Sequence, residues 1–133
     1  MPFYTSPTQF YDCLGELFGR ISAEGDASLK SLTDSKLVFR FQCLDPAAEI
    51  TINGRTTPAQ HHFGPVNLPP TLDITLPADT LHHIMLGELG IMKALGSGKL
   101  KIKGPMLKAK ALGDLFGRSQ ALYPQVLREK GLL

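Results

Sequence analysis

Two pairs of adjacent histidines, His61-His62 and His82-His83, are the side chains in this sequence best suited to hold a metal ion. Adjacent side chains point to opposite faces of a strand and diverge by about 100° around a helix, so neither pair can chelate one ion by itself. One histidine from each pair could still meet in space, but no cysteine or carboxylate at metal-ligand spacing accompanies them. The sequence therefore predicts no metal site.

Motifs for phosphate binding and for a serine nucleophile are incomplete. Gly96-Ser97-Gly98-Lys99 is similar to the end of a phosphate-binding loop, but Lys93 stands where the first glycine is required. Leu100 occupies the position that needs a serine or threonine. A Gly-x-Ser-x-Gly elbow at Ser97 would need glycines at the positions that Leu95 and Lys99 occupy. Neither nucleotide binding nor serine catalysis is indicated.

The cysteines and carboxylates do not form a catalytic group either. Cys13 and Cys43 stand alone at apolar positions of their segments, which is typical of buried thiols. The carboxylates are scattered over polar positions, and no pair can be placed opposite a substrate: Asp73, Asp79, Glu88 and Asp114. We therefore expect no catalytic residue and no cofactor.

The first predicted element is a helix with one apolar side, which should face the protein interior. Ser6 can cap it, Pro7 suits its first position, and Gln9 can complete a capping box. Gly25 is expected to end the helix. The apolar stripe recurs at helical spacing and consists of Phe10, Leu14, Leu17, Phe18 and Ile21.

Alternating apolar and polar residues then predict four strands in succession. Apolar residues alternate from Leu37 to Cys43, and a second strand carrying Ile50 and Ile52 follows the turn at Asp45-Pro46. Asn53-Gly54 is a strong turn signal, so a third strand is expected over 59–63 and a fourth over 72–76. We expect these four strands to be antiparallel. The face opposite the apolar residues should be exposed to water, because it carries Arg40, Gln42, Thr51, Asp73 and Thr75.

The second half of the sequence alternates helices with one further strand. Helical patterns begin at Pro77 and at Ile91, and a strand over 99–103 directs Leu100 and Ile102 to one face and three lysines to the other. Gly104 permits a sharp turn, and Pro105 suits the first position of another helix. We expect that helix to be interrupted at Gly117 and a last helical piece to start at Tyr123. Strands followed by helices and a returning strand indicate an α+β fold with helices on one face.

Composition and charge narrow the class of protein. The 133 residues fit one domain over 1–133, and 43% hydrophobic and 20% charged residues are typical of a soluble globular protein. The stretch from Met1 to Thr5 lacks a basic region followed by an apolar run, so we expect no secretory signal and a cytoplasmic protein. A net charge of +2 is too small to indicate a nucleic-acid partner, and the oligomeric state stays open.

Several segments together resemble the sterol carrier protein 2 domain family. They are the strand Leu72 to Leu76, the helical pattern from Leu81 to Met85, Gly87, and the glycine-bounded strand from Gly98 to Gly104 before an amphipathic helix. The resemblance spans essentially the whole chain, and the N-terminal half agrees in pattern more than in identities. It implies a five-stranded, mostly antiparallel sheet covered on one face by helices, enclosing an apolar tunnel.

The function implied by the resemblance is non-catalytic binding and transfer of sterols, fatty acids, acyl-CoAs or phospholipids. An alternative is an accessory or scaffold protein that presents prenylated or quinone-type intermediates to biosynthetic enzymes, and a third is a lipid-modifying enzyme. Met85, Met92 and Met106 could adapt to different ligand shapes or fill an ordinary core. The expected lipid-contacting residues are Phe18, Phe39, Phe41, Ile52, Ile74, Met85, Ile102, Leu112, Leu115 and Phe116.

Lysines form the densest basic region of the sequence. Lys99, Lys101 and Lys103 could contact anionic lipid head groups at a membrane surface, together with Lys108 and Lys110. They could equally form the solvated side of an edge strand, where lysines also discourage edge-to-edge aggregation. The sequence leaves both interpretations open.

Overall fold

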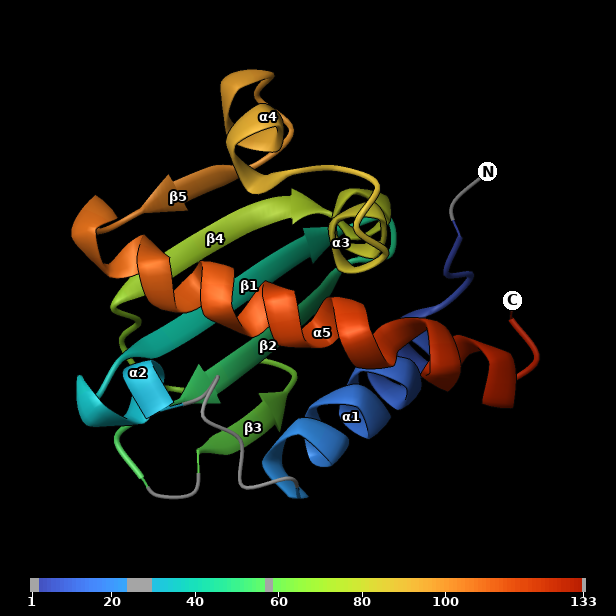
Figure 1. The fold of residues 1–133 in the computed structure, drawn as a ribbon, viewed down its shortest axis with the longest axis horizontal. Coiled ribbons are helices and arrows are strands. Elements are labelled where there is room, and N and C mark those ends of the chain that lie inside the picture. The colour runs from blue at the N-terminus through green and yellow to red at the C-terminus, as the bar shows by residue number, and fades with distance from the viewer. Residues whose placement is uncertain (1–2, 24–29, 57–58, 133) are drawn as a thin grey trace.

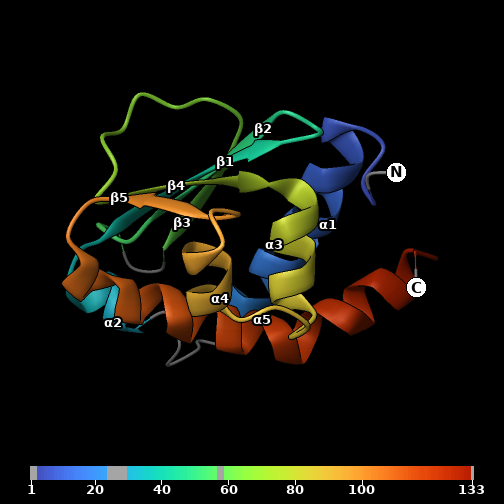
Figure 2. The same cartoon turned by 90° about the horizontal axis from the view of Figure 1, so that it is seen from above.

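A five-stranded sheet carries helices on one of its faces in the computed structural model, which describes residues 3–23, 30–56 and 59–132 (Figures 1 and 2). The strand order across the sheet is β3-β2-β1-β4-β5. The strands are β1 (Val38–Leu44), β2 (Ala48–Asn53), β3 (Gln60–Phe63), β4 (Leu72–Pro77) and β5 (Lys101–Lys103). The helices are α1 (Pro7–Ala23), α2 (Lys30–Asp34), α3 (Ala78–Met85), α4 (Ile91–Gly96), the 3-10 turn η2 (Met106–Lys108) and α5 (Ala109–Glu129).

The direction of β4 differs from the sequence expectation of four antiparallel strands. β1 pairs with β2 antiparallel but with β4 parallel, with Phe41 opposite Ile50 on one side and Ile74 on the other. The physical reason is the connection after β3. Tight turns reverse the chain, whereas residues 64–71 carry it across the sheet to the far side of β1, so that β4 starts at the same end as β1 (Figure 2). The sheet as a whole remains mostly antiparallel.

The polar face of the sheet is less exposed than the sequence predicts. Arg40 and Asp73 are neighbours across β1 and β4, and their Nη2 and Oδ2 atoms lie 2.5 Å apart. Gln42 donates a hydrogen bond of 2.8 Å from its amide nitrogen to Asp73 Oδ1. Thr51, expected in water, is fully buried. The segment 64–71 passes over this side of the sheet, opposite the helices (Figure 2).

Helix α1 forms as predicted, because its apolar stripe is buried along its whole length. Ser6 Oγ accepts a hydrogen bond of 3.1 Å from the Gln9 amide, which satisfies one of the free donors at the helix start. Gln9 Oε1 accepts a hydrogen bond of 2.8 Å from the amide of Thr5. A capping box would use the amide of Ser6, so the Gln9 side chain bonds one residue earlier in the chain than expected. The expected stop at Gly25 lies outside the described residues.

The expected break in the last helix is wrong. Helix α5 runs without interruption from Ala109 to Glu129 and includes both Gly117 and Pro124. A glycine in a helix costs about 1 kcal/mol and a proline about 3 kcal/mol. Tertiary burial outweighs these costs, because buried residues occur on both sides of each position, from Leu115 to Leu127.

Strand β5 is shorter than expected, but its two faces are as predicted. Leu100 is buried and Lys101 and Lys103 are exposed. Gly104 has φ of +128°, and a Cβ atom there would lie 2.3 Å from the carbonyl oxygen of Thr71. Pro105 does not begin α5 directly; it precedes the 3-10 turn η2, and α5 starts at Ala109.

Candidate functional site

The ten residues predicted to contact lipid lie in one place, the apolar layer between the sheet and the helices. Nine of them are buried in a single cluster, and Ile102 is partly buried and packs against it. Sheet and helices contribute equally. The strands supply Phe39, Phe41, Ile52, Ile74 and Ile102, and the helices supply Phe18, Met85, Leu112, Leu115 and Phe116.

Strand register explains why these side chains meet. Ile52 lies opposite Phe39, and Ile74 lies between Phe41 and Ile102 in neighbouring strands, so all five point to the helix side. On α5, Leu112, Leu115 and Phe116 recur at spacings of three and one and form one face. The rings of Phe41 and Phe116 have centroids 6.0 Å apart and join the two layers directly.

Of the three methionines considered as candidates, two do not belong to this layer. Met85 is fully buried, whereas Met92 and Met106 are 76% and 51% exposed. The suggestion that all three line the interior is therefore wrong for Met92 and Met106. The cause is local: α4 buries only Ala94, and η2 buries no residue.

His61, considered above only as a metal ligand, is half-buried on the side of β3 that faces α1. Its ring stacks on Phe18, with centroids 5.4 Å apart, and its Nε2 atom is buried without a hydrogen-bond partner in the described structure. Burial lowers the pKa of His61, and the neighbouring His62 lowers it further. Side chains alternate between the two faces of a strand, and His61 lies opposite Ile52, so it shares the apolar face of the sheet. This alternation could have identified His61 as an inward-facing residue.

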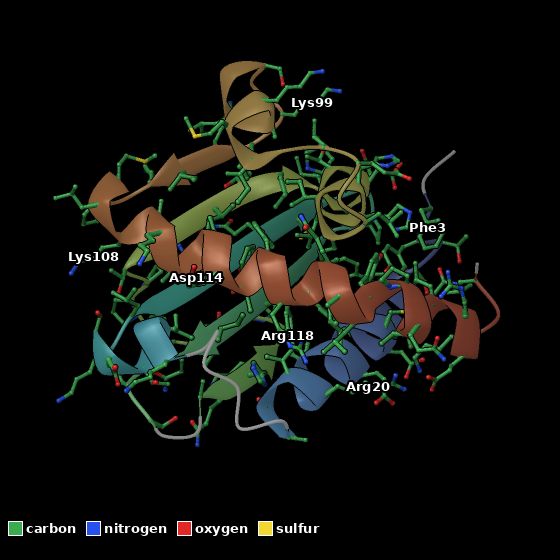
Figure 3. The ribbon with its side chains drawn as sticks, in the orientation of Figure 1. Phe3, Arg20, Lys99, Lys108, Asp114 and Arg118 are labelled. Atoms are coloured by element: carbon green, nitrogen blue, oxygen red, sulfur yellow. The ribbon has the colours of Figure 1, made fainter. Side chains whose placement is uncertain are left out.

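A cluster of three polar side chains, Tyr4, His82 and Tyr123, joins the N-terminal segment to α3 and α5. The hydroxyls of Tyr4 and Tyr123 are hydrogen-bonded to each other, and Tyr123 Oη lies 2.6 Å from His82 Nδ1. Phe3 stacks on His82 at a centroid distance of 3.8 Å beside α3 (Figure 3). Burial raises the pKa of both tyrosines and lowers that of His82. These groups are therefore neutral near pH 7 and act as a structural clamp.

The two thiols are poor nucleophiles in this environment. Burial raises the pKa of Cys43 to about 12. Burial is also the main reason that the pKa of Cys13 is raised. Since the thiolate is the reactive form, both side chains behave as small apolar residues.

Three hollows are described on the surface, and none of the ten predicted residues borders them. One of about 540 Å³ lies beside α3 and includes Asp79, His83, Glu88 and Lys99. His83 Nδ1 is 2.7 Å from Glu88 Oε1 there. The others, of about 590 and 370 Å³, border α1 and the β1–β2 turn. The apolar tunnel thus stays a prediction, as do the ten lining residues.

Neither histidine pair joins a larger ligand set. Within the described part of the chain, no group of three or more His, Cys, Asp or Glu side chains is arranged to hold a metal ion. Among the same residues, every helix is too short or too polar to cross a bilayer.

Comparison with known proteins identifies the fold. A family model described as the SCP-2 sterol transfer family matches residues 15–117. This chain belongs to that family. Membership in the SCP-2 family implies lipid binding and transfer, and its domains are generally non-catalytic. No curated protein sequence matches the chain.

Solved structures of SCP-2 proteins share this architecture. Sterol Carrier Protein 2 from Yarrowia lipolytica, in its apo form, superimposes with a TM-score of 0.59 at 16% identity over 74% of this chain and 80% of its own. Palmitated SCP2L2 from Aedes aegypti gives 0.57 at 17% identity over 75% and 90%. A UbiJ-SCP2 ubiquinone synthesis protein gives 0.50 at 13% identity over 72% and 77%. At these identities the similarity shows the fold alone.

Proposed function

We propose that this protein binds the apolar part of a lipid between its sheet and its helices and carries it through water without changing it. The observation that carries the proposal is the continuous apolar layer, in which α5 residues such as Leu112 and Phe116 face Phe41 and Ile74 of the sheet. The similarity to a family member solved in a palmitated form supports the same reading.

The energy of binding would come from the hydrocarbon itself. Each methylene that leaves water contributes about 0.8 kcal/mol, so a long acyl chain needs few polar contacts to be retained. A lining of phenylalanine, leucine, isoleucine and methionine offers shape without specific hydrogen bonds. We therefore expect the protein to accept several lipids that share chain length more than head group.

The alternative role, presenting prenylated or quinone-type intermediates to enzymes, is compatible with the similarity to the UbiJ-SCP2 protein but is not favoured by it. The two roles differ in what accompanies the protein. A pull-down that recovers quinone-pathway enzymes together with a bound prenylated quinone precursor would support the accessory role. Lipid uptake by the isolated protein would support the carrier role.

The first test is the ligand state of the purified protein. Native mass spectrometry after gentle purification should show a protein mass increased by a lipid, and a fluorescent fatty acid should bind to the delipidated protein. A clean unliganded mass together with no uptake of the fluorescent fatty acid would contradict the proposal.

A bulky substitution tests the position of the ligand. Leu112→Trp places a larger ring in a fully buried α5 position, and we expect it to abolish fatty-acid uptake. Overpacking of this kind costs about 1–3 kcal/mol of stability, so the folded fraction is checked by circular dichroism and urea unfolding.

The matched control is Ala121→Trp, which adds the same ring at an exposed position of α5 and should leave uptake unchanged. If Leu112→Trp does not fold, Ala111→Leu adds less volume at a buried neighbouring position and serves as the second variant. Normal lipid affinity in a folded interior variant would show that the ligand lies elsewhere.

A further inference from the structure

One stretch of this chain is purely basic. Residues 89–113 hold six lysines and no acidic residue, while the rest of the sequence holds eight basic and twelve acidic residues. All six side chains are exposed. We call this stretch the basic edge, and its lysines are Lys93, Lys99, Lys101, Lys103, Lys108 and Lys110.

The basic edge lies along one rim of the sheet. Its elements α4, β5, η2 and the first turn of α5 follow one another in the chain, and β5 is the edge strand of the sheet, next to β4. Lys99 and Lys108, before and after β5, both point away from the body of the molecule (Figure 3). The amides of Lys99 and Leu100 bond to the Ala94 carbonyl oxygen at 3.0 and 3.2 Å, which fixes α4 against the start of β5.

Large apolar side chains are exposed on the same rim. Among the residues that the structure describes, five large hydrophobic side chains are exposed, and three of them belong to the basic edge. Leu107 is 94% exposed, Met92 is 76% exposed and Met106 is 51% exposed. Met106 and Leu107 form the tip of η2, and Lys103 and Lys108 flank them in sequence. Three of the exposed large apolar side chains thus lie on the same elements as the six lysines.

We propose that the basic edge is a docking surface for an anionic lipid bilayer. The lysines attract the anionic head groups, and Leu107 and Met106 enter the boundary between head groups and acyl chains. This surface goes beyond the proposed lipid-binding interior, because none of its exposed residues belongs to the buried layer. The two proposals can therefore fail separately.

The residue types favour a bilayer over other anionic partners. Nucleic-acid surfaces use arginine for base contacts and aromatic rings for stacking, and residues 89–113 contain neither. Protein interfaces are enriched in aromatic residues, methionine and arginine and depleted in lysine; the exposed methionines fit such an interface, but six lysines without an aromatic residue or arginine do not. Exposed leucine and methionine beside lysine match the requirement of a reversible membrane contact, which combines apolar insertion with charge attraction.

The test is binding of the whole protein to large unilamellar vesicles, measured by co-sedimentation. Vesicles of phosphatidylcholine with about 30 mol% phosphatidylserine should bind the protein, and vesicles of phosphatidylcholine alone should bind it at least about tenfold less. Raising the salt from about 0.1 M to about 0.5 M should release the protein, because it shortens the screening length.

Substitutions separate the two contributions. Lys108→Gln/Lys110→Gln should weaken binding by about fivefold for each lysine, whereas Arg55→Gln/Arg128→Gln removes two exposed charges elsewhere and should change it little. Leu107→Ser should weaken binding several-fold, whereas Leu44→Ser removes a half-exposed leucine on another element and should not. Circular dichroism and urea unfolding verify that each variant is folded.

Three results would overturn the proposal: equal binding to both kinds of vesicle, unchanged binding of folded Leu107→Ser, or equal losses in the variants and their controls. If Lys108→Gln/Lys110→Gln or Leu107→Ser loses vesicle binding but takes up a fluorescent fatty acid normally, the result would support the docking surface independently of the interior. Preferential binding of the basic edge to duplex DNA, or its burial in a dimer detected by sedimentation, would assign it to another partner.

Discussion

Gly104 shows how one missing side chain fixes the course of the backbone. Its φ of +128° belongs to a region that glycine alone occupies readily, and the Thr71 carbonyl oxygen fills the space where a Cβ would stand. The residue therefore lets the end of β5 approach the start of β4 closely. Sequence alone suggested a turn at Gly104 but could not show the neighbour that makes glycine obligatory.

The corresponding variant is Gly104→Ala. We expect it to lower the free energy of unfolding by about 3 kcal/mol or more, because it combines backbone strain with a steric clash. Gly98→Ala is the matched control: Gly98 also has positive φ, of +78°, but open space surrounds it, so its cost should be about 1–2 kcal/mol. Urea unfolding measures both. Equal losses would show that the contact with Thr71 is unimportant.

The interior residues were largely predictable one by one, because period and burial agree. Phe39, Phe41 and Ile74 alternate with polar neighbours, and Leu112 lies on the apolar stripe of its helix. The exposed Met92 and Met106 were not predictable. An apolar residue type does not reveal whether its element has a partner, and η2 has none that buries it.

The packing of one element against another depends on contacts between residues far apart in the sequence, which no local sequence pattern predicts. The clamp of Tyr4, Tyr123 and His82 joins the N-terminal segment, α5 and α3 across more than a hundred residues of chain. The hydroxyls of the two tyrosines share one buried hydrogen bond, so removal of either hydroxyl breaks it.

A double-mutant cycle tests this clamp. Tyr4→Phe and Tyr123→Phe should each lower the free energy of unfolding by about 1–3 kcal/mol. The double variant should lose less than the sum, with a coupling of about 1 kcal/mol, because the second removal breaks a bond that is already lost. Chemical denaturation of all four proteins gives the coupling. Strictly additive losses would mean that the hydroxyls do not interact.

Elements were easier to predict than their arrangement. Helix α1 and strands β1, β2 and β4 follow from spacing and turn residues that are local in sequence. The parallel pairing of β1 with β4 does not, because alternation marks a strand without marking its partner or direction. The continuity of α5 through Gly117 and Pro124 depends on packing against the rest of the molecule, which local propensity omits.

The stability of the whole molecule should depend on the neutral state of two histidines. Burial lowers the pKa of His61 and of His82 below the ordinary value of 6.5. Around His82, His83 lowers the pKa further, while Asp79 and Glu88 oppose the shift. The unfolded chain therefore binds protons that the folded protein does not bind between the lowered pKa values and 6.5.

Stability should consequently be highest above pH 6.5 and should decline as the pH falls through the lowered pKa values of the folded state. Urea midpoints measured from about pH 8 to about pH 5 give the slope, and this window stays above the ordinary titration of carboxylates. His61→Phe/His82→Phe should flatten the slope. A midpoint that rises on acidification would contradict the assignment.

The crossing from β3 to β4 also sets an order of folding. The turns that join β1, β2 and β3 close short loops, whereas β1 meets β4 only after more than thirty residues of intervening chain, as the pairing of Phe41 with Ile74 shows. Loop closure over such a separation costs more entropy, and non-local pairing slows folding. The three-stranded meander of β1 to β3 should therefore assemble early. The β1–β4 pair should form late, in the step that brings β4, β5 and α5 over the interior and first shelters the apolar layer from water.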